Sequence, residues 1–468
     1  MATRMAPADA VWFLGENDVN PMTISSILWF DRPLDTPLLT ARVVDRLLER
    51  HPILTERVVP SRIPGRMPRW VDDPRFDPAE HLTEHVLPAP GDQAALQAWC
   101  SRERTTPLDR TRPLWHLSIL QGYRGGGSAV HVRIHHSIGD GLALLQLLLS
   151  VTDEFEPGDT LIGERSLAAR VSGVLGAGPA LLAFGSDLAL HPSRVGEVTR
   201  NGLHAVGWTG RLLAPQMVER TILQGTPEGT KRMAWDPDGF PLAEVKATAR
   251  GIGATVNDVL LTVLGGALHR YLAARDALVE DVAVMIPINL RPPGEPLPRR
   301  LGNRIGLLPL RVPVRSPDPL VRLAVLRERM DELKRSPAPA LSRSLIVATT
   351  LLTPVVERGV HRLNQLRSTG VVTNVAGPVA PLHIGGARLL GTMGWGGLTA
   401  HLNLSAAFVS VGERIMAGLV TDAAITPDPE CILAELAAEY PTTIGALSGA
   451  PAAPSHPAGP DVAAGERG

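Results

Sequence analysis

The stretch VHVRIHHSIGDGL, residues 130–142, predicts a strand that enters a tight turn and then a helix. Apolar residues alternate along residues 130–134, as the period of two in a strand requires, and His136 continues this alternation. Residues 137–141 are Ser-Ile-Gly-Asp-Gly. Glycine tolerates a positive φ, and serine and aspartate side chains can hydrogen-bond to the nearby backbone, so this composition is typical of a turn. Leucines then recur at helical spacing. The pattern therefore places a histidine at the end of a strand and Asp140 four residues later, in the turn.

Length and composition bound the interpretation. The 468 residues exceed one typical core, so two domains are expected. Lys plus Arg number 46 and Asp plus Glu 47, so no overall charge favours nucleic acid. Cys100 and Cys431 are too few for a disulfide framework and lack partners at metal-ligand spacing, which favours a reducing compartment.

We expect no signal peptide, and no apolar run reaches the ~20 residues of a membrane-spanning helix. Residues 171–185 come nearest and are interpreted as a buried or interfacial helix pair.

The order of predicted elements indicates an α/β protein with two mixed-sheet halves. We place the halves at residues 1–160 and 235–447. Residues 161–234 are predicted to form a helical connector, because this segment is too apolar to remain a solvated linker. Residues 448–468, mostly Pro, Ala and Gly, are expected to be disordered.

Several local signals in the second half are specific. Thr255 and Asp258 form an acidic capping box that predicts the start of a helix. Residues 282–288 are almost all apolar, which is typical of a strand that is buried on both faces. Residues 402–411 and 415–420 predict two paired strands.

His136 is the candidate general base. A neutral imidazole can remove a proton from a hydroxyl as that oxygen attacks an acyl carbonyl. No Gly-x-Ser-x-Gly elbow is present, and Ser137 points away from His136 because neighbouring strand residues face opposite sides. Direct transfer without an acyl-enzyme therefore fits best. The pattern also allows a structural interpretation, in which His135 and His136 are half-buried and only close the strand. A metal site is a weaker alternative, because no third ligand stands at useful spacing.

Asp140 has two candidate partners. Its carboxylate could accept the other imidazole N–H, or it could hold the turn by pairing with an arginine. A turn aspartate beside two glycines is normally structural, which favours the arginine. Arg291, at the end of a predicted buried strand in the other half, is the candidate partner. Glu16, at the end of the first apolar segment, could face the site or could only cap that segment, and the second interpretation is favoured.

Residues 135–141, HHSIGDG, match the HHxxxDG motif of the bacterial wax ester synthase/diacylglycerol acyltransferases, and the chain resembles this family. It is also similar to the wider superfamily of chloramphenicol acetyltransferase-like acyltransferases, which includes condensation domains. Further segments resemble family landmarks from about Asp9 to about Tyr440. These are the opening segment Asp9–Glu16, a PLW element at Pro113–Trp115, an ND element at Asn257–Asp258, Leu301–Asn303, and Thr373–Pro378.

The resemblance implies two acetyltransferase-like halves with an active-site tunnel between them. His136 would be the general base, with His135 supporting it and Asp140 orienting it. An acyl-CoA and either a long-chain alcohol or diacylglycerol would enter from opposite ends of the tunnel. The products would be coenzyme A and a wax ester or triacylglycerol.

Substrate contacts are expected from Asn257, Gly141 and Asn374. Asn257, near a helix N-terminus, could donate to the tetrahedral oxyanion or could be an ordinary first-turn residue.

Acyl-CoA is expected as co-substrate, with no cofactor, metal or nucleic acid. The lipid substrates imply peripheral association with the inner face of a membrane or with lipid inclusions.

The sequence leaves related functions open. A secondary-metabolite or condensation-type acyltransferase would act on a different alcohol or amine, but this sequence contains no carrier or adenylation domain. A catalytically silent lipid-binding protein would be expected to lack His136. Two departures from the bacterial pattern bear on the acceptor. Ser137-Ile138-Gly139 looks more like the plant branch of the superfamily, and Ala376 stands where the family's SNVPGP element usually has proline or valine. Acceptor preference, acyl-chain length and oligomeric state therefore stay open.

Overall fold

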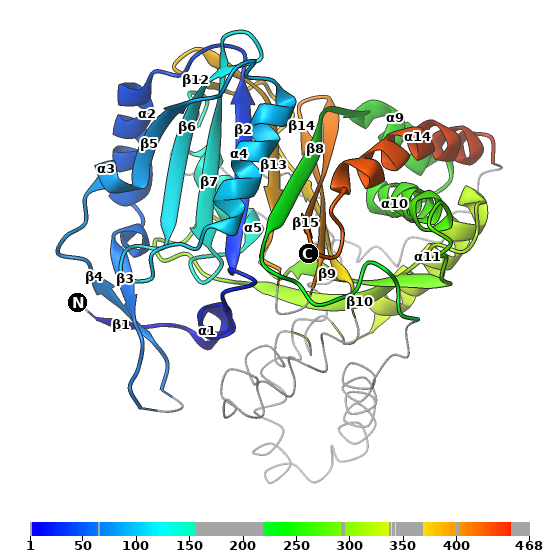
Figure 1. Cartoon of the computed structure of the whole chain (residues 1–468), viewed down its shortest axis with the longest axis horizontal. Helices are drawn as coiled ribbons and strands as arrows, with labels where there is room; N and C mark the ends of the chain where they lie inside the picture. Colours follow the sequence, from blue (N-terminus) through cyan, green and yellow to red (C-terminus); the bar gives the residue numbers. More distant parts are fainter. Residues whose placement is uncertain are drawn as a thin grey trace, which may run out of the picture.

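The computed structural model describes residues 2–63, 66–155, 219–291, 295–336, 338, 342, 368–398 and 402–450. These residues build two six-stranded mixed sheets and a small antiparallel sheet, which lie in two adjoining halves (Figure 1). The first sheet has the order β12 (His383–Ile384), β13 (Ala387–Trp395), β2 (Thr23–Phe30), β7 (Gly127–His135), β6 (Trp115–Tyr123), β5 (Leu82–Val86). The second has the order β10 (Ile305–Pro313), β9 (Asp281–Asn289), β11 (Gly370–Ala376), β14 (Leu404–Val411), β15 (Arg414–Asp422), β8 (Lys231–Pro241). The small sheet has the order β1 (Thr3–Arg4), β4 (Arg69–Asp72), β3 (Glu56–Val59).

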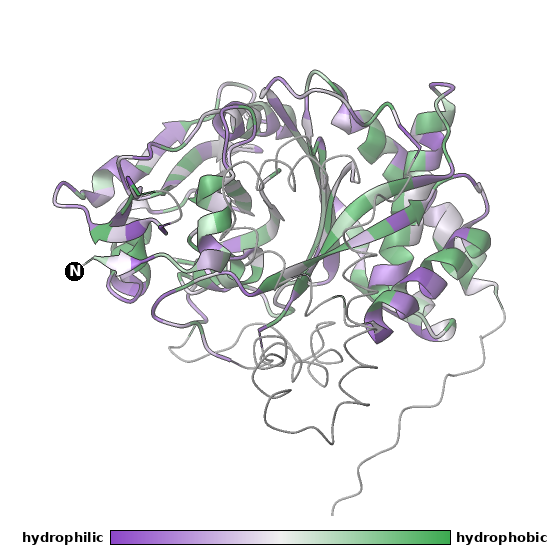
Figure 2. Ribbon diagram, turned by 90° about the horizontal axis from the view of Figure 1, so that it is seen from below, coloured by the Kyte–Doolittle hydropathy of each residue, from purple (hydrophilic) through white to green (hydrophobic). Residues whose placement is uncertain are grey.

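Helices surround both sheets. Those of the first half are α1 (Pro7–Leu14), α2 (Thr36–Val43), α3 (Pro78–His81), α4 (Gln93–Thr105) and α5 (Gly141–Leu149), with a π-helical turn at Val44–Leu48 and a 3-10 turn at Pro52–Leu54. Those of the second half are α9 (Leu242–Gly251), α10 (Val256–Ala273), α11 (Pro319–Arg335) and α14 (Pro429–Ser448). Figure 2 shows apolar residues concentrated on strands and helices near the centre of the molecule. The arrangement confirms the predicted α/β class.

The second sheet has two different environments. On one face, Val284, Val372 and Phe408 pack in a core with α9, α10, α11 and α14. On the other face, Val409 and Val420 join the core of the first half. The second sheet is therefore covered by helices outside and by the other half inside.

The predicted local signals are present. Thr255 accepts from the backbone N–H of Asp258, and the Asp258 carboxylate accepts from the backbone N–H of Thr255, so the capping box starts α10. Strands β14 and β15 pair in antiparallel register, as expected. The last helix, α14, contains Pro441 and continues to Ser448, the first residue of the tail that was expected to be disordered. Packing of its far end in the helical core outweighs the hydrogen bond that proline cannot make.

One segment crosses the predicted boundary between the halves. Residues 383–395, assigned to the second half, form β12 and β13 and extend the first sheet through antiparallel pairing of β13 with β2. Strand alternation is the same whichever sheet a strand joins, so sequence periodicity could not reveal this exchange. Residues 161–218 of the predicted connector, including 171–185, and residues 451–468 of the predicted tail lie outside the described residues.

An aromatic cluster joins the two sheets. Trp235 of β8 lies with its ring centroid 6.4 Å from that of Trp29 and 5.7 Å from that of Trp395, both in the first sheet. Gly418 of β15 permits this approach, because a Cβ there would lie 2.6 Å from Trp395 and 2.8 Å from Trp235. The two halves are therefore packed through large apolar side chains. Gly418, which pairs with Trp235 in the same sheet, leaves the space that these side chains fill.

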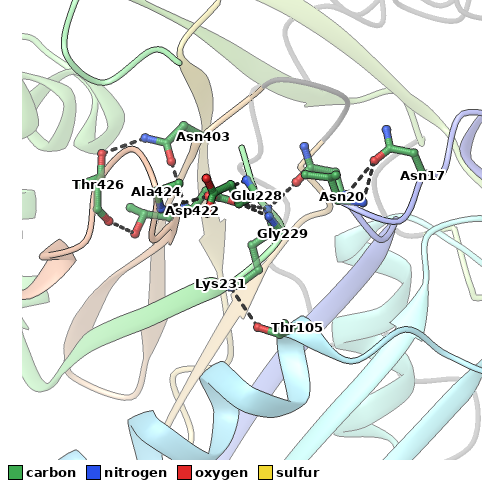
Figure 3. A network of polar contacts seen from close by, with 12 residues as sticks. Asn17, Asn20, Thr105, Glu228, Gly229, Lys231, Asn403, Asp422, Ala424 and Thr426 are labelled. Atoms are coloured by element: carbon green, nitrogen blue, oxygen red, sulfur yellow. Dashed lines mark hydrogen bonds and ion pairs between the residues drawn. The ribbon is translucent and has the colours of Figure 1, made fainter. Parts of the chain in front are cut away.

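A buried ion pair adds a polar connection between the halves (Figure 3). Lys231 Nζ lies 2.9 Å from Asp422 Oδ2 and donates to Asn20 Oδ1 at 2.5 Å. The side chains of Lys231 and Asp422 are 2% and 0% exposed. Backbone N–H groups of residues 228 and 229 also donate to Asp422. The pair therefore fixes the loop that contains Asn20 against the second sheet.

We expect Lys231→Met to lower the free energy of unfolding by about 3–5 kcal/mol, because it leaves the Asp422 charge buried and unpaired. Arg232→Met is the matched control, since Arg232 pairs with Glu430 at the surface and both side chains are about half exposed. That change should cost about 0–1 kcal/mol. Urea unfolding followed by tryptophan fluorescence measures both. Equal effects of the two substitutions would contradict the structural role of the Lys231 pair.

Candidate active site

His136 lies directly after β7, at the junction of the strand with the turn that leads to α5. All nine residues of β7 are buried, and His136 is 6% exposed. The backbone N–H of His136 donates to the carbonyl of Met22 at 2.7 Å, and that of Ile138 donates to His135 at 3.0 Å. The predicted strand, turn and helix are therefore confirmed. The expected left-handed glycines are absent from the turn, because neither Gly139 nor Gly141 has a positive φ.

Two side chains from other elements hold the imidazole of His136. Trp12 of α1 stacks on it, with ring centroids 3.8 Å apart and planes 9° from parallel. Asn303, in the segment before β10, has its Oδ1 3.0 Å from His136 Nδ1. The Asn303 Nδ2 group donates to Asp9 Oδ1 and to the His136 carbonyl, each at 2.8 Å. Asp9 and Trp12 are three residues apart on α1, so they lie on the same side of that helix.

Burial controls the charge of His136. Loss of hydration lowers the pKa of its imidazole from 6.5 to about 4. A hydrogen bond to its own backbone carbonyl, the nearby Asp140 and the bond with Asn303 act in the opposite direction but do not restore the ordinary value. The imidazole is therefore neutral at neutral pH and can accept a proton.

His135 has a different set of partners. The backbone N–H of Ser137 donates to His135 Nδ1 at 3.0 Å, and the Ser137 hydroxyl lies 2.7 Å from the same nitrogen. Ser137 thus pairs with His135 and not with His136, as the strand geometry predicts. The Nε2 atom of His135 lies 3.5 Å from Glu16 Oε1.

Glu16 is placed beside His135 and does more than end the first helix, which corrects its interpretation as a cap. Its Oε1 accepts from the backbone N–H of Met22 at 3.0 Å. Burial alone would raise the pKa of Glu16, but the neighbouring His135, the charge of Arg110 and the hydrogen bond from the Met22 backbone hold it below its usual value. Glu16 is therefore a half-buried carboxylate that lies against His135 and holds the Met22 backbone.

Asp140 pairs with arginine, as the turn chemistry favours. Its Oδ1 accepts from the backbone N–H of Ala143 at 2.9 Å and so caps α5. Its Oδ2 accepts from the backbone N–H of Arg304 at 2.9 Å and lies 3.5 Å from Arg291 Nη2. Asp140 and Arg291 are both buried, and in the described part of the chain Asp140 makes no hydrogen bond with the His136 ring. The expected pair with Arg291 is confirmed.

The three expected substrate contacts make no hydrogen bond to this cluster within the part of the chain that the structure describes. Gly141 is the exposed first residue of α5, and a Cβ there would meet nothing within 4 Å. Asn257 is half-buried in the first turn of α10. Asn374 is exposed on β11 opposite Phe408, whose side chain packs toward the helices. No hydrogen bond between described residues joins any of them to His136. Their contacts with substrate stay predictions, as does the tunnel.

Sequence reasoning did not assign a role to Asp9, Trp12 or Asn303, although it singled out their segments. A signal was available for Asp9, which lies within an otherwise apolar helix and is 7% exposed. A buried carboxylate needs hydrogen-bond partners. No comparable signal marked Trp12 or Asn303, because their partner is 124 and 167 residues away along the chain.

Comparisons with known proteins agree with this geometry. The wax ester synthase/diacylglycerol acyltransferase catalytic domain matches residues 5–260, and the WS/DGAT C-terminal domain matches residues 301–442. A Mycobacterium tuberculosis protein named "Probable diacyglycerol O-acyltransferase tgs2" is 27% identical over 451 residues, which cover 92% of this chain and 96% of that protein. Its relative named "Probable diacyglycerol O-acyltransferase tgs1" is 26% identical over 367 residues, 77% and 78% of the two chains.

Solved structures share the fold. The wax ester synthase/diacylglycerol acyltransferase from Marinobacter aquaeolei VT8 has a TM-score of 0.66 at 21% identity, over 95% of this chain and 100% of that one. The first condensation domain of the calcium-dependent antibiotic synthetase has a TM-score of 0.60 at 16% identity, over 97% of each chain. The predicted acetyltransferase-like architecture is therefore confirmed. Because the catalytic-domain match alone spans more than half of the sequence, this chain belongs to the wax ester synthase/diacylglycerol acyltransferase family and is an acyltransferase.

Proposed function

We propose that this acyltransferase moves a fatty acyl group from coenzyme A to the hydroxyl of diacylglycerol or a long-chain alcohol, with His136 as general base. The observation that carries the proposal is the buried, neutral imidazole of His136, held by Trp12 and Asn303. In the reaction, His136 takes the hydroxyl proton as the oxygen attacks the thioester carbonyl. The tetrahedral intermediate then breaks its C–S bond, and the protonated imidazole returns the proton to the leaving thiolate.

Direct transfer is favoured over an acyl-enzyme. The Ser137 hydroxyl lies against His135 and not against His136. Among the residues described, no serine or cysteine side chain is hydrogen-bonded to the His136 ring. Cys100 is fully buried, and burial raises the pKa of its thiol far above the usual value. A thiol with a raised pKa is a poor nucleophile.

The acceptor is proposed as diacylglycerol first and a long-chain alcohol second. The names of the mycobacterial relatives support diacylglycerol, and the name of the Marinobacter enzyme includes both activities. Condensation domains share the fold at 16% identity, which supports no common substrate.

We expect His136→Gln to lower the rate of thiol release from palmitoyl-CoA by about 10²-fold or more, since it removes the base. The assay is run with dioleoylglycerol and with hexadecanol. His116→Gln is the control, because His116 is a half-buried histidine of the same sheet that makes no contact with His136. Wild-type activity in His136→Gln would refute its role as base. Failure of both acceptors to support thiol release would refute the proposed substrates.

The pKa of His136 also sets the pH dependence of the free enzyme. A base works in its unprotonated form, so a pKa of about 4 keeps it active from neutral pH down to mildly acidic pH. We expect kcat/KM to stay flat between about pH 6 and 8 and to fall only as the pH approaches about 4. Circular dichroism at each pH separates this effect from unfolding. An acidic limb near the ordinary histidine value of 6.5 would contradict the effect of burial.

We also propose that the protein binds lipid surfaces at the inner face of the membrane or on lipid inclusions, because both proposed acceptors are insoluble in water. Among the described residues, no single helix meets the length and hydropathy expected of a membrane span, and only the pair α9–α10, bent by 103°, does so jointly. Flotation with vesicles that contain dioleoylglycerol should carry the protein upward, whereas a run without vesicles should not. Protein that stays in the lower fraction in both runs would refute the proposal.

A further inference from the structure

We propose that Asn303, itself held by Asp9, is a positioning residue that keeps the proton of neutral His136 on Nδ1 and leaves Nε2 free to act as the base. The inference deepens the proposed function and rests on His136 being the base. It concerns which ring nitrogen carries the proton, which is decided by hydrogen bonds in the folded protein.

The Asp9 carboxylate fixes the orientation of the Asn303 amide. Asp9 Oδ1 lies 2.8 Å from both the backbone nitrogen and Nδ2 of Asn303. Asp9 Oδ1 accepts from the backbone N–H of Asn303, so the NH₂ group of Asn303, which can only donate, is the end of the amide that faces it. The second N–H of that group donates to the His136 carbonyl at 2.8 Å. The reversed amide would place its oxygen against two other acceptors, so only the observed orientation is satisfied.

This orientation directs the Asn303 oxygen at the imidazole. Asn303 Oδ1 lies 3.0 Å from His136 Nδ1, and an amide oxygen cannot donate a hydrogen bond. His136 Nδ1 must therefore carry the proton. The carbonyl of His136 itself is a second acceptor for that ring. A neutral imidazole has one N–H, so Nε2 keeps its lone pair, and no hydrogen bond from the described residues occupies Nε2.

Helix α1 supports both parts of this arrangement. Asp9 holds Asn303 from one position of the helix, and Trp12 covers the imidazole face from the next turn. Gly302 precedes Asn303 beside Asp9 and has a φ of +149°, a backbone conformation that favours glycine. The ring is thus fixed in its plane by stacking and at one nitrogen by the amide.

His135 provides an internal comparison. Its Nδ1 accepts from the backbone N–H of Ser137, which can only donate. The proton of neutral His135 must therefore lie on Nε2, the nitrogen that faces Glu16. Two adjacent histidines are thereby assigned opposite tautomers by different neighbours.

The test combines NMR with kinetics. In ¹⁵N-histidine-labelled protein, long-range ¹H–¹⁵N correlations distinguish the two tautomers, and the His136 signals are identified by their loss in His136→Gln. Wild type should show the Nδ1–H form for His136 and the Nε2–H form for His135. In Asn303→Ala, His136 should shift toward the Nε2–H form, and kcat should fall by about 10- to 100-fold, as is typical when an orienting partner is lost. KM should change less than about twofold.

Two further variants control for general damage. Asn403→Ala removes another buried amide, bonded to Thr426 and the Leu223 carbonyl, and should keep the His136 tautomer and the kcat of the folded fraction. Asp9→Asn preserves size but allows the Asn303 amide to reverse, so it should mix the tautomers even if Asn303→Ala does not fold.

The outcomes separate this inference from the proposed function. Wild-type activity of His136→Gln would remove the base role itself. If His136→Gln is inactive while Asn303→Ala and Asp9→Asn keep the Nδ1–H form, Asn303 does not set the tautomer and the inference fails. If the tautomer changes while kcat stays at the wild-type value, the amide does not position the base and the inference also fails.

Discussion

The hydrogen bonds from Asp9 through Asn303 to His136 connect three distant parts of the chain. Asp9 and Asn303 are separated by 294 positions, and Asn303 and His136 by 167. Each group is buried, so the folded protein would be less stable if one group lacked its hydrogen-bond partner. The N-terminal helix, the end of β7 and the segment before β10 must therefore come together before the polar groups of any one of them are satisfied. The site is therefore complete only when both halves are in place.

The buried pair Lys231–Asp422 acts on the same region from the other side. Lys231 donates to Asn20, and two residues later the carbonyl of Met22 accepts from the backbone of His136. Glu16 accepts from the Met22 N–H and closes this loop against His135. Buried ion pairs contribute little net stability compared with apolar residues of the same shape. What this pair provides is a fixed path for the loop, and hence for the His136 backbone.

The sequence predicted correctly those features that depend on residues close together along the chain. The alternation before His136, the leucine spacing of α5 and the capping box at Thr255 depend on residues within a few positions of one another, and all three are present. The pair Asp140–Arg291 was inferred because a turn aspartate beside two glycines is normally structural, and the two side chains lie 3.5 Å apart. The addition of β13 to the first sheet and the contacts of Asn303 depend on distant partners. Neither leaves a periodic trace in the sequence.

The two adjacent histidines show how one residue type takes two roles. The backbone N–H of Ser137 donates to Nδ1 of His135, and the other ring nitrogen of His135 lies 3.5 Å from the Glu16 carboxylate. His136 has only Nδ1 committed, to a group that accepts. A base needs an uncommitted lone pair, and only His136 has one. The neighbours of each imidazole therefore decide which of the two adjacent histidines keeps a free lone pair.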